Sequence, residues 1–251
     1  MKSTGGLYVM ADIYYREDTS AGYTVIYIGN DSIAVGSTTK WNVEKGAICL
    51  RKRARIIGDT FILPENAQYL FYGVSMFVNG SLDMSKWDAS QCTNMTSMFE
   101  ACYLNDIDIS AWDLSNVTTM KRMFRLCQNL YTVSINTPTP SLTNTMEMFS
   151  NDGTASGGMP IKTISLRGFT VNNLTNSSLM FWNCYSLSQI LTNENTDWAK
   201  EVPAGSTHLD LFSGCTSLPN WDVDSTIGRA NTDWYFTGVR EWTACKVYMK
   251  V

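Results

Sequence analysis

The sequence predicts an α/β repeat solenoid, in which units of about 25 residues, each with one short strand and one short helix, stack around one core. Two observations support this prediction. A dipeptide of a large residue followed by phenylalanine recurs along the chain. Within each unit the spacing of the apolar residues also changes from a helical to a strand-like period. A small β-rich unit is expected before the repeats.

The recurring dipeptide sets the length of the unit. It occurs as Met76-Phe77, Met98-Phe99, Met123-Phe124, Met148-Phe149, Met180-Phe181, Leu211-Phe212 and Tyr235-Phe236. The steps between successive phenylalanines are 22, 25, 25, 32, 31 and 24 residues. The two long steps indicate insertions, and the Gly-rich stretch 151–158 is typical of an exposed loop.

Each unit is expected to contain one short helix and one short strand. The helical stripe consists of apolar positions spaced by three, four and three residues, as in Val117, Met120, Phe124 and Cys127. In the strand, Ile107 and Ile109 alternate with polar residues, which indicates a half-buried segment. The same strand pattern is found at 82–87, 133–138 and 164–169.

The two ends of the chain differ in pattern. Residues 1–65 lack the repeat and are predicted to form a β-rich cap or docking unit, with strands at 23–28 and 47–50. Residues 66–251 are predicted to form a solenoid of about seven units. A last strand at 245–249 is expected to close it, because this segment lies in the register of the earlier strands.

Composition excludes several classes of protein. The net charge of −4 does not favour binding to a polyanion, and the one basic cluster, 51–55, is interpreted as the solvated face of a strand. No apolar run approaches the roughly 18 residues that a membrane-spanning helix needs. Asp12 interrupts the first apolar stretch, so the sequence does not predict a signal peptide.

Two segments closely resemble one known repeat. They read LDMSKWD at 82–88 with MFEAC at 98–102, and IDISAWDLSNVTTM at 107–120 with MFRLC at 123–127. Both are similar to the BspA-like leucine-rich repeat, a family of bacterial surface proteins that includes mycoplasma lipoproteins. The resemblance is specific over 76–149, looser to 251 and absent over 1–65. It implies a fold of the leucine-rich-repeat type and a surface-displayed, adhesive or ligand-binding role without catalytic residues.

The candidate binding site is a polar sheet face. Strand residues that alternate with buried ones point outward, and in stacked strands they form one continuous surface, which solenoids use for binding. These residues are Asp83, Ser85, Asp108, Ser110, Ser134, Asn136, Ser165 and Arg167. The alternative is that this face is merely solvated.

Side chains that could carry chemistry have structural interpretations. Cys102, Cys127, Cys184 and Cys215 share one repeat position, which predicts a column of buried free thiols rather than a zinc site, since no pair has zinc-ligand spacing. The one histidine, His208, is interpreted as a packing residue. No catalytic residue, metal or cofactor is therefore predicted. The sequons at Asn94, Asn116 and Asn173 arise from the polar turns of the repeat.

The sequence favours a non-enzymatic binding or adhesion protein on a cell surface, whose partner is a protein or glycan of a host or neighbouring cell. No nucleic acid and no membrane insertion are expected. The alternative is a phage virion component, such as a fibre, decoration or receptor-binding protein, that docks to other virion proteins through residues 1–65. A weaker alternative is a glycan hydrolase that uses a pair of the recurring aspartates. An extracellular, cell-surface or virion-surface location is expected.

Overall fold

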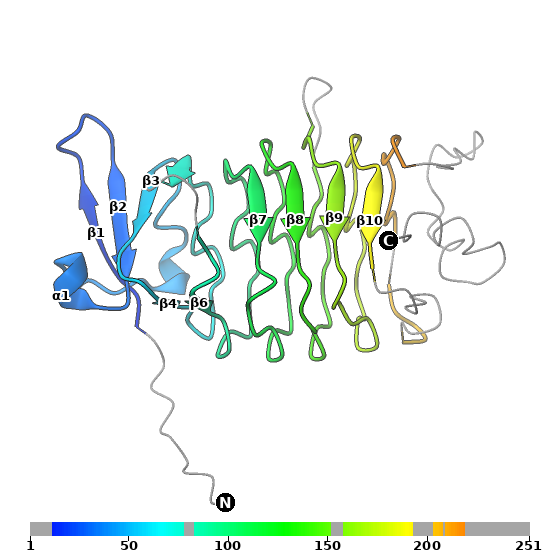
Figure 1. Cartoon of the computed structure of the whole chain (residues 1–251), viewed down its shortest axis with the longest axis horizontal. Helices are drawn as coiled ribbons and strands as arrows, with labels where there is room; N and C mark the ends of the chain where they lie inside the picture. The colour runs from blue at the N-terminus through cyan, green and yellow to red at the C-terminus, as the bar shows by residue number, and fades with distance from the viewer. Residues whose placement is uncertain (1–11, 78–82, 152–157, 193–202, 208, 219–251) are drawn as a thin grey trace, which may run out of the picture.

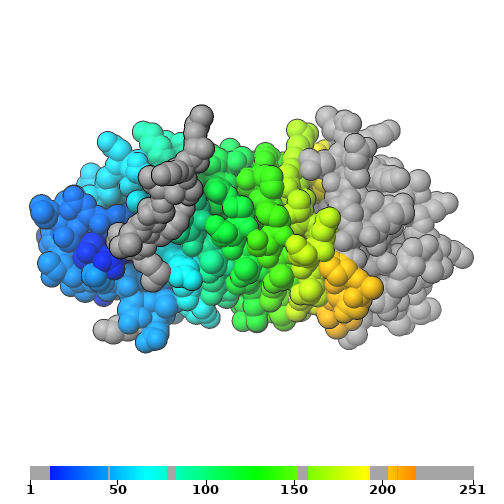
Figure 2. All heavy atoms as spheres, turned by 90° about the horizontal axis from the view of Figure 1, so that it is seen from below, coloured from blue at the N-terminus to red at the C-terminus, as the bar shows by residue number. Residues whose placement is uncertain are grey.

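The computed structural model describes residues 12–77, 83–151, 158–192, 203–207 and 209–218, and it shows an elongated stack of units (Figure 1). Four strands, one from each of four successive units, form a parallel sheet in the order β10-β9-β8-β7. They are β7 (Asp106–Asp108), β8 (Thr132–Ser134), β9 (Thr163–Ser165) and β10 (Gln189–Leu191). Figure 2 shows the units as successive bands of colour along the molecule. The predicted repeat solenoid is confirmed.

Three of the four strands predicted from alternation form, as β7, β8 and β9. The strand predicted at 82–87 is wrong for residues 83–86, which form no strand, and Leu82 lies outside the described residues. Ile107, Val133 and Ile164 lie side by side in β7, β8 and β9, and all three are buried. Their polar neighbours along each strand turn away from this core, since successive strand residues face opposite sides.

The predicted helix of each unit is wrong, because a run of tight turns takes its place. Alternate amides bond in different directions. The Cys102 amide donates to the Phe99 carbonyl of its own unit over 3.2 Å, whereas the Phe99 amide donates to the Met123 carbonyl of the next unit over 3.0 Å. A helix keeps all such bonds within one segment. These units instead share half of them with a neighbour.

The turns need backbone conformations that a right-handed helix excludes. Ser97 and Ala101 have φ of 54° and 58°, and Arg122 and Leu126 have 57° and 60° at the equivalent positions of the next unit. Two such turns in tandem place residues spaced by four and by three, such as Met95, Phe99 and Cys102, on the side that faces the core. The apolar spacing of the sequence is therefore that of a helix although the segment is not helical.

A column of phenylalanine rings runs through the core. The centroids of successive rings are 5.4, 5.9, 5.5, 5.6 and 5.2 Å apart, from Phe71 through Phe99, Phe124, Phe149 and Phe181 to Phe212. The prediction that Phe77 belongs to the first repeat of this series is wrong. Met76-Phe77 forms β5 (Met76–Phe77), and Leu70-Phe71 fills the place in the column. Phe236 and the predicted strand at 245–249 lie outside the described residues.

The N-terminal part adds a second sheet, with strand order β1-β2-β3-β5. Its first strands are β1 (Tyr14–Asp18), β2 (Val25–Gly29) and β3 (Arg53–Ile56), of which β1 and β2 are antiparallel and the other pairs parallel. The strand predicted at 23–28 is confirmed as β2. Between β2 and β3 lie the short helix α1 (Ser32–Val35), which Asp31 caps, and the 3-10 helix η1 (Val43–Lys45).

The stacked turns begin within residues 1–65. The strand predicted at 47–50 is wrong, because 48–51 form a turn. In this turn the Lys52 amide donates to the Cys49 carbonyl, and the Arg51 amide donates to the Gly73 carbonyl of the next unit, both over 2.9 Å. These are the two bond directions that recur through the stack.

One continuous core joins both parts of the molecule. Buried residues from Ile13 to Leu218 belong to a single cluster. A short parallel pair, β4 (Phe61–Ile62) and β6 (Trp87–Asp88), closes the opposite side of the first units, and the Trp87 ring stacks on Trp112 at 5.6 Å. Among the described residues, no helix has the length and apolar character needed to cross a membrane.

Candidate functional site

The outer face of the β7–β10 sheet carries the predicted polar side chains on β7 and β8, and Leu191 of β10 lies in register with them. Asp108 of β7, Ser134 of β8 and Ser165 of β9 are paired in register across three strands. Asp108 is exposed and Ser134 is partly exposed. Asn136 and Arg167, beyond the ends of β8 and β9, are also exposed.

Ser165 does not belong to the accessible face, so its predicted exposure is wrong. It is only 8% exposed, and its hydroxyl donates to Asn136 Oδ1 over 2.6 Å. The same Oδ1 accepts the Arg167 amide, and the Asn136 amide donates to Ser110 Oγ. This part of the face uses its polar groups to join the units, which leaves fewer of them for a ligand.

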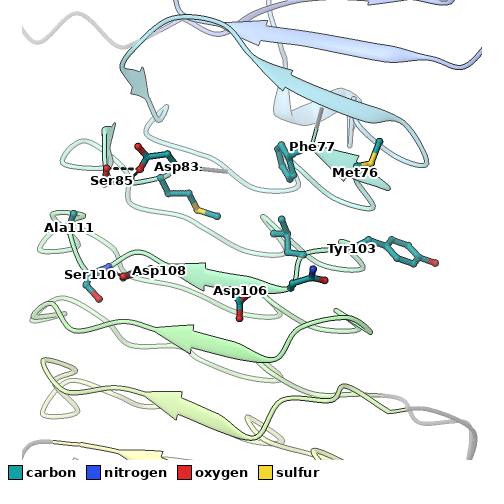
Figure 3. A pocket seen from close by; sticks show the side chains of 12 residues that line it. Met76, Phe77, Asp83, Ser85, Tyr103, Asp106, Asp108, Ser110 and Ala111 are labelled. Atoms are coloured by element: carbon teal, nitrogen blue, oxygen red, sulfur yellow. Dashed lines mark hydrogen bonds between the residues drawn. The ribbon is translucent and has the colours of Figure 1, made fainter. Parts of the chain in front are cut away.

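A hollow in the outer face lies at the junction of the two sheets, between β5 and β7 (Figure 3). It brings together four of the eight predicted residues, namely Asp83, Ser85, Asp108 and Ser110. The remaining lining comes from Met76, Phe77, Met84, Tyr103, Leu104, Asn105, Asp106 and Ala111. The other four predicted residues lie outside it, farther along the stack.

Hydrogen bonds orient the three carboxylates of the hollow. Ser85 donates to Asp83 Oδ1 through both its hydroxyl, over 2.6 Å, and its amide, over 3.0 Å. Asp108 Oδ1 accepts the Ser110 amide over 3.0 Å. Asp106 Oδ1 accepts the Thr132 hydroxyl over 2.6 Å. Each carboxylate therefore has a fixed direction and retains lone pairs that can accept further donors.

The carboxylates give the hollow an acidic character. The Ser85 hydroxyl and amide lower the pKa of Asp83, so this side chain is ionised at neutral pH. Within the described part of the chain, no lysine or arginine forms an ion pair with Asp83, Asp106 or Asp108. The hollow thus offers charged acceptors to hydroxyl or ammonium groups.

Two lining residues, Asp106 and Tyr103, were not among the predicted binding residues. Asp106 alternates with Ile107 on the same face as Asp108, but it precedes the first apolar residue of its strand, where the pattern was not extended. Tyr103 is 54% exposed at the hollow. The available signal was an aromatic residue directly after Cys102, in a position that holds Tyr185 in one other unit and Gln128 and Thr216 in two more.

The cysteine column is structural, as predicted. Cys102, Cys127, Cys184 and Cys215 are buried free thiols. Each donates to the carbonyl of the phenylalanine in the preceding unit, over 2.8 to 3.1 Å. Burial raises the pKa of the Cys127 thiol to about 12, which removes its nucleophilic form at neutral pH. His208 lies outside the described residues.

The sequons also have structural uses. The Asn116 and Asn173 side-chain amides donate to the carbonyls of Ser90 and Pro140 in the preceding unit, over 2.8 and 2.7 Å. Asn94 Oδ1 accepts the Thr96 amide over 2.9 Å and so orients the start of a turn. Asn116 and Asn173 therefore join neighbouring units, whereas Asn94 shapes a turn within its own unit.

The chain matches a family described as "Mycoplasma protein of unknown function, DUF285" over residues 65–161. No curated protein and no solved structure matches the chain. The matched segment contains the first four stacked phenylalanines and every lining residue of the hollow. Over this segment the chain is similar to a Mycoplasma-type repeat family of unknown function.

Proposed function

We propose that this chain is a non-enzymatic binding protein of the cell surface, which binds a neutral glycan of a host or neighbouring cell in the hollow between β5 and β7. The observation that carries the proposal is that three oriented carboxylates and one exposed tyrosine line the same hollow. Carboxylates accept hydrogen bonds from sugar hydroxyls, and an aromatic ring packs against the apolar face of a sugar. The BspA-like resemblance of the same segment supports a surface-displayed role.

The Asp83 side chain is better suited to binding than to hydrolysis. A glycosidase needs one carboxylic acid whose pKa is raised, so that it can donate a proton to the leaving group. The pKa of Asp83 is instead lowered by Ser85. An ionised, hydrogen-bonded aspartate is suited to hold a ligand rather than to protonate it.

The test begins with an array of neutral glycans and continues by calorimetry on the best ligand. Tyr103→Ala should weaken binding at least tenfold, about 1.4 kcal/mol, because buried aromatic contacts dominate binding energies. Tyr131→Ala is the matched control, since Tyr131 is 52% exposed but does not line the hollow. It should bind with unchanged affinity.

A second pair of variants tests the carboxylates. Asp108→Asn should also lose binding, whereas Asp113→Asn should not, although Asp113 accepts the Ser115 amide in the same way that Asp108 accepts the Ser110 amide. Equal losses in a variant and its control would place the site elsewhere. Release of reducing ends from the bound glycan would identify a hydrolase.

A further inference from the structure

A surface of opposite charge lies on the outer face of the N-terminal sheet. Arg16 of β1, Tyr27 of β2 and Arg55 of β3 lie side by side, because Arg16 pairs with Tyr27 and Tyr27 pairs with Arg55. Arg53 shares this face with Arg55, since the residue between them is buried. Together with Tyr23, these residues form what we call the arginine-tyrosine surface.

Tyrosine rings hold the guanidinium groups in place. Arg53 Cζ lies 3.6 Å from the centroid of the Tyr23 ring. Arg16 and Arg55 flank Tyr27, with Cζ 3.9 and 5.9 Å from its centroid. A stacked guanidinium engages the ring through its flat face and keeps the N–H donors at its edge. Arg16 already donates through Nε to the Val35 carbonyl over 2.7 Å. Among the described residues, the rings therefore orient Arg53 and Arg55 as the cations whose hydrogen-bonding edges remain available.

The positive charge of this surface is only partly compensated. Asp18 lies 3.6 Å from Arg16, and the neighbouring Lys52 is paired with Glu17 at 2.7 Å. Among the described residues, neither Arg53 nor Arg55 has an acidic partner. This excess of positive charge lies within a chain whose net charge is −4. An anionic ligand would supply the missing counter-charge.

We propose that the arginine-tyrosine surface binds an acidic polysaccharide that carries sulfate or carboxylate groups. A guanidinium edge matches two oxygens of such a group. Arg53 and Arg55 share one face of β3, and Arg16 lies two strands from Arg55 on the same sheet, so several cations follow one another as the anions of a polysaccharide chain do. The proposal is independent of the neutral-glycan site, which lies in the acidic hollow.

The tyrosines argue for a polysaccharide over a single-stranded nucleic acid. Proteins that bind single strands stack the bases on exposed aromatic faces. Here Arg16 and Arg55 flank the partly buried Tyr27, and Arg53 lies over one face of Tyr23, which is 41% exposed. Tyr27 is thus not a free platform, and one ring alone does not provide the row of stacking surfaces that successive bases need.

The experiment measures binding of the full chain to a heparin oligosaccharide, which is sulfated, and to a galacturonate oligosaccharide, which is carboxylated. Arg53→Gln with Arg55→Gln should weaken binding at least tenfold. The control, Lys86→Gln with Lys162→Gln, removes the same charge at other exposed positions and should stay within twofold. Arg53→Lys with Arg55→Lys should recover only part of the affinity, because an ammonium group lacks the planar edge.

Binding of either oligosaccharide with this pattern supports the proposal. It is overturned if neither binds, if the lysine control loses as much as the arginine variant, or if the Arg→Lys variant binds like the unaltered chain. Tighter binding of single-stranded DNA of equal charge would also overturn it. Melting curves of all variants verify that the loss is not one of folding.

Discussion

At the residue scale, the cysteine column shows how contacts with a neighbouring unit limit which side chain can occupy one repeat position. The position three residues after a stacked phenylalanine is occupied by Val74 in the first unit and by Cys102 and Cys127 in the next two. Each thiol is small enough for the core and donates to a carbonyl of the preceding unit. Burial keeps the thiol neutral, because it penalises the thiolate.

Alkaline pH should destabilise the folded state, because burial disfavours the Cys127 thiolate. The folded pKa of Cys127, about 12, lies above its ordinary value of 9.0, so the folded state holds the proton more tightly than the unfolded state. The stabilisation is complete below pH 9.0 and decreases as the pH rises towards the folded value, by about 1.4 kcal/mol per pH unit. Cys127→Val, which copies Val74, should lose less stability between pH 9 and 11 in urea unfolding. Identical slopes would contradict the burial effect.

The left-handed residues of the turns offer a second test at this scale. Ala101 has a φ of 58°, which disfavours any residue with a Cβ atom, and the equivalent positions hold Gly73 and Gly214. Ala101→Gly should therefore raise the free energy of unfolding, by up to about 1 kcal/mol. Ala89→Gly is the control, because Ala89 is buried and has no positive φ. It should destabilise the protein in the same unfolding assay, and loss of stability in both variants would argue against strain at Ala101.

At the element scale, the sequence predicts where each turn run lies but not what it is. The spacing of Met95, Phe99 and Cys102 places the right residues in the core, since tandem turns and a helix repeat at similar intervals. The signal against a helix was the composition two residues after each phenylalanine, where Gly73, Asn183 and Gly214 favour positive φ. That signal is weak in single units, because Ala101 and other non-glycine residues adopt the same conformation.

A network of ion pairs joins the turn runs of successive units. Arg125 lies between two carboxylates, with Nη1 2.7 Å from Glu100 Oε1 and Nε 3.1 Å from Glu147 Oε2. Glu147 also pairs with Arg122 over 2.9 Å. Glu100 and Glu147 are only 4% and 7% exposed, so each depends on a cation for its solvation. The network joins three consecutive units.

Removal of the central cation should be costly. Arg125→Ala leaves Glu100 buried without its cation and weakens the environment of Glu147, which should cost about 3 kcal/mol of unfolding free energy. Lys40→Ala is the control, because it breaks the exposed pair with Asp12 and should cost at most about 1 kcal/mol. Chemical denaturation measures both. Adding Glu100→Gln to Arg125→Ala should restore part of the loss, and a further loss would exclude the charge explanation.

At the scale of the whole molecule, the sequence predicts the stack but not its first register. Phe77 fits the dipeptide pattern, yet Phe71 joins the ring column, because β5 takes up Met76 and Phe77 to pair with β3. The pairing partner lies more than twenty residues away, which local spacing does not encode. The same limit applies to the hollow. Alternation identified Asp83 and Asp108, but the junction of two sheets that brings them together depends on the long-range fold.

The shared core predicts that the molecule unfolds as one unit. Phe124 is fully buried, with its ring 5.9 Å from Phe99 and 5.5 Å from Phe149. Phe124→Ala should cost on the order of 3 to 5 kcal/mol. The unfolding midpoints followed by tryptophan fluorescence and by far-UV circular dichroism should shift by the same amount, since one core spans both sheets. Two separated transitions would show that the N-terminal sheet folds independently, and Phe124→Leu should give a smaller shift in the same direction.

The alternation of backbone bonds has a mechanical consequence. Bonds such as that from the Phe99 amide to the Met123 carbonyl join one unit to the next, and equivalent bonds join each further pair of units. A force that pulls the two ends of the stack apart acts equally on every interface between successive units. The resistance of the stack to force is then that of its weakest interface, so units would detach one after another while the rest keep their shape.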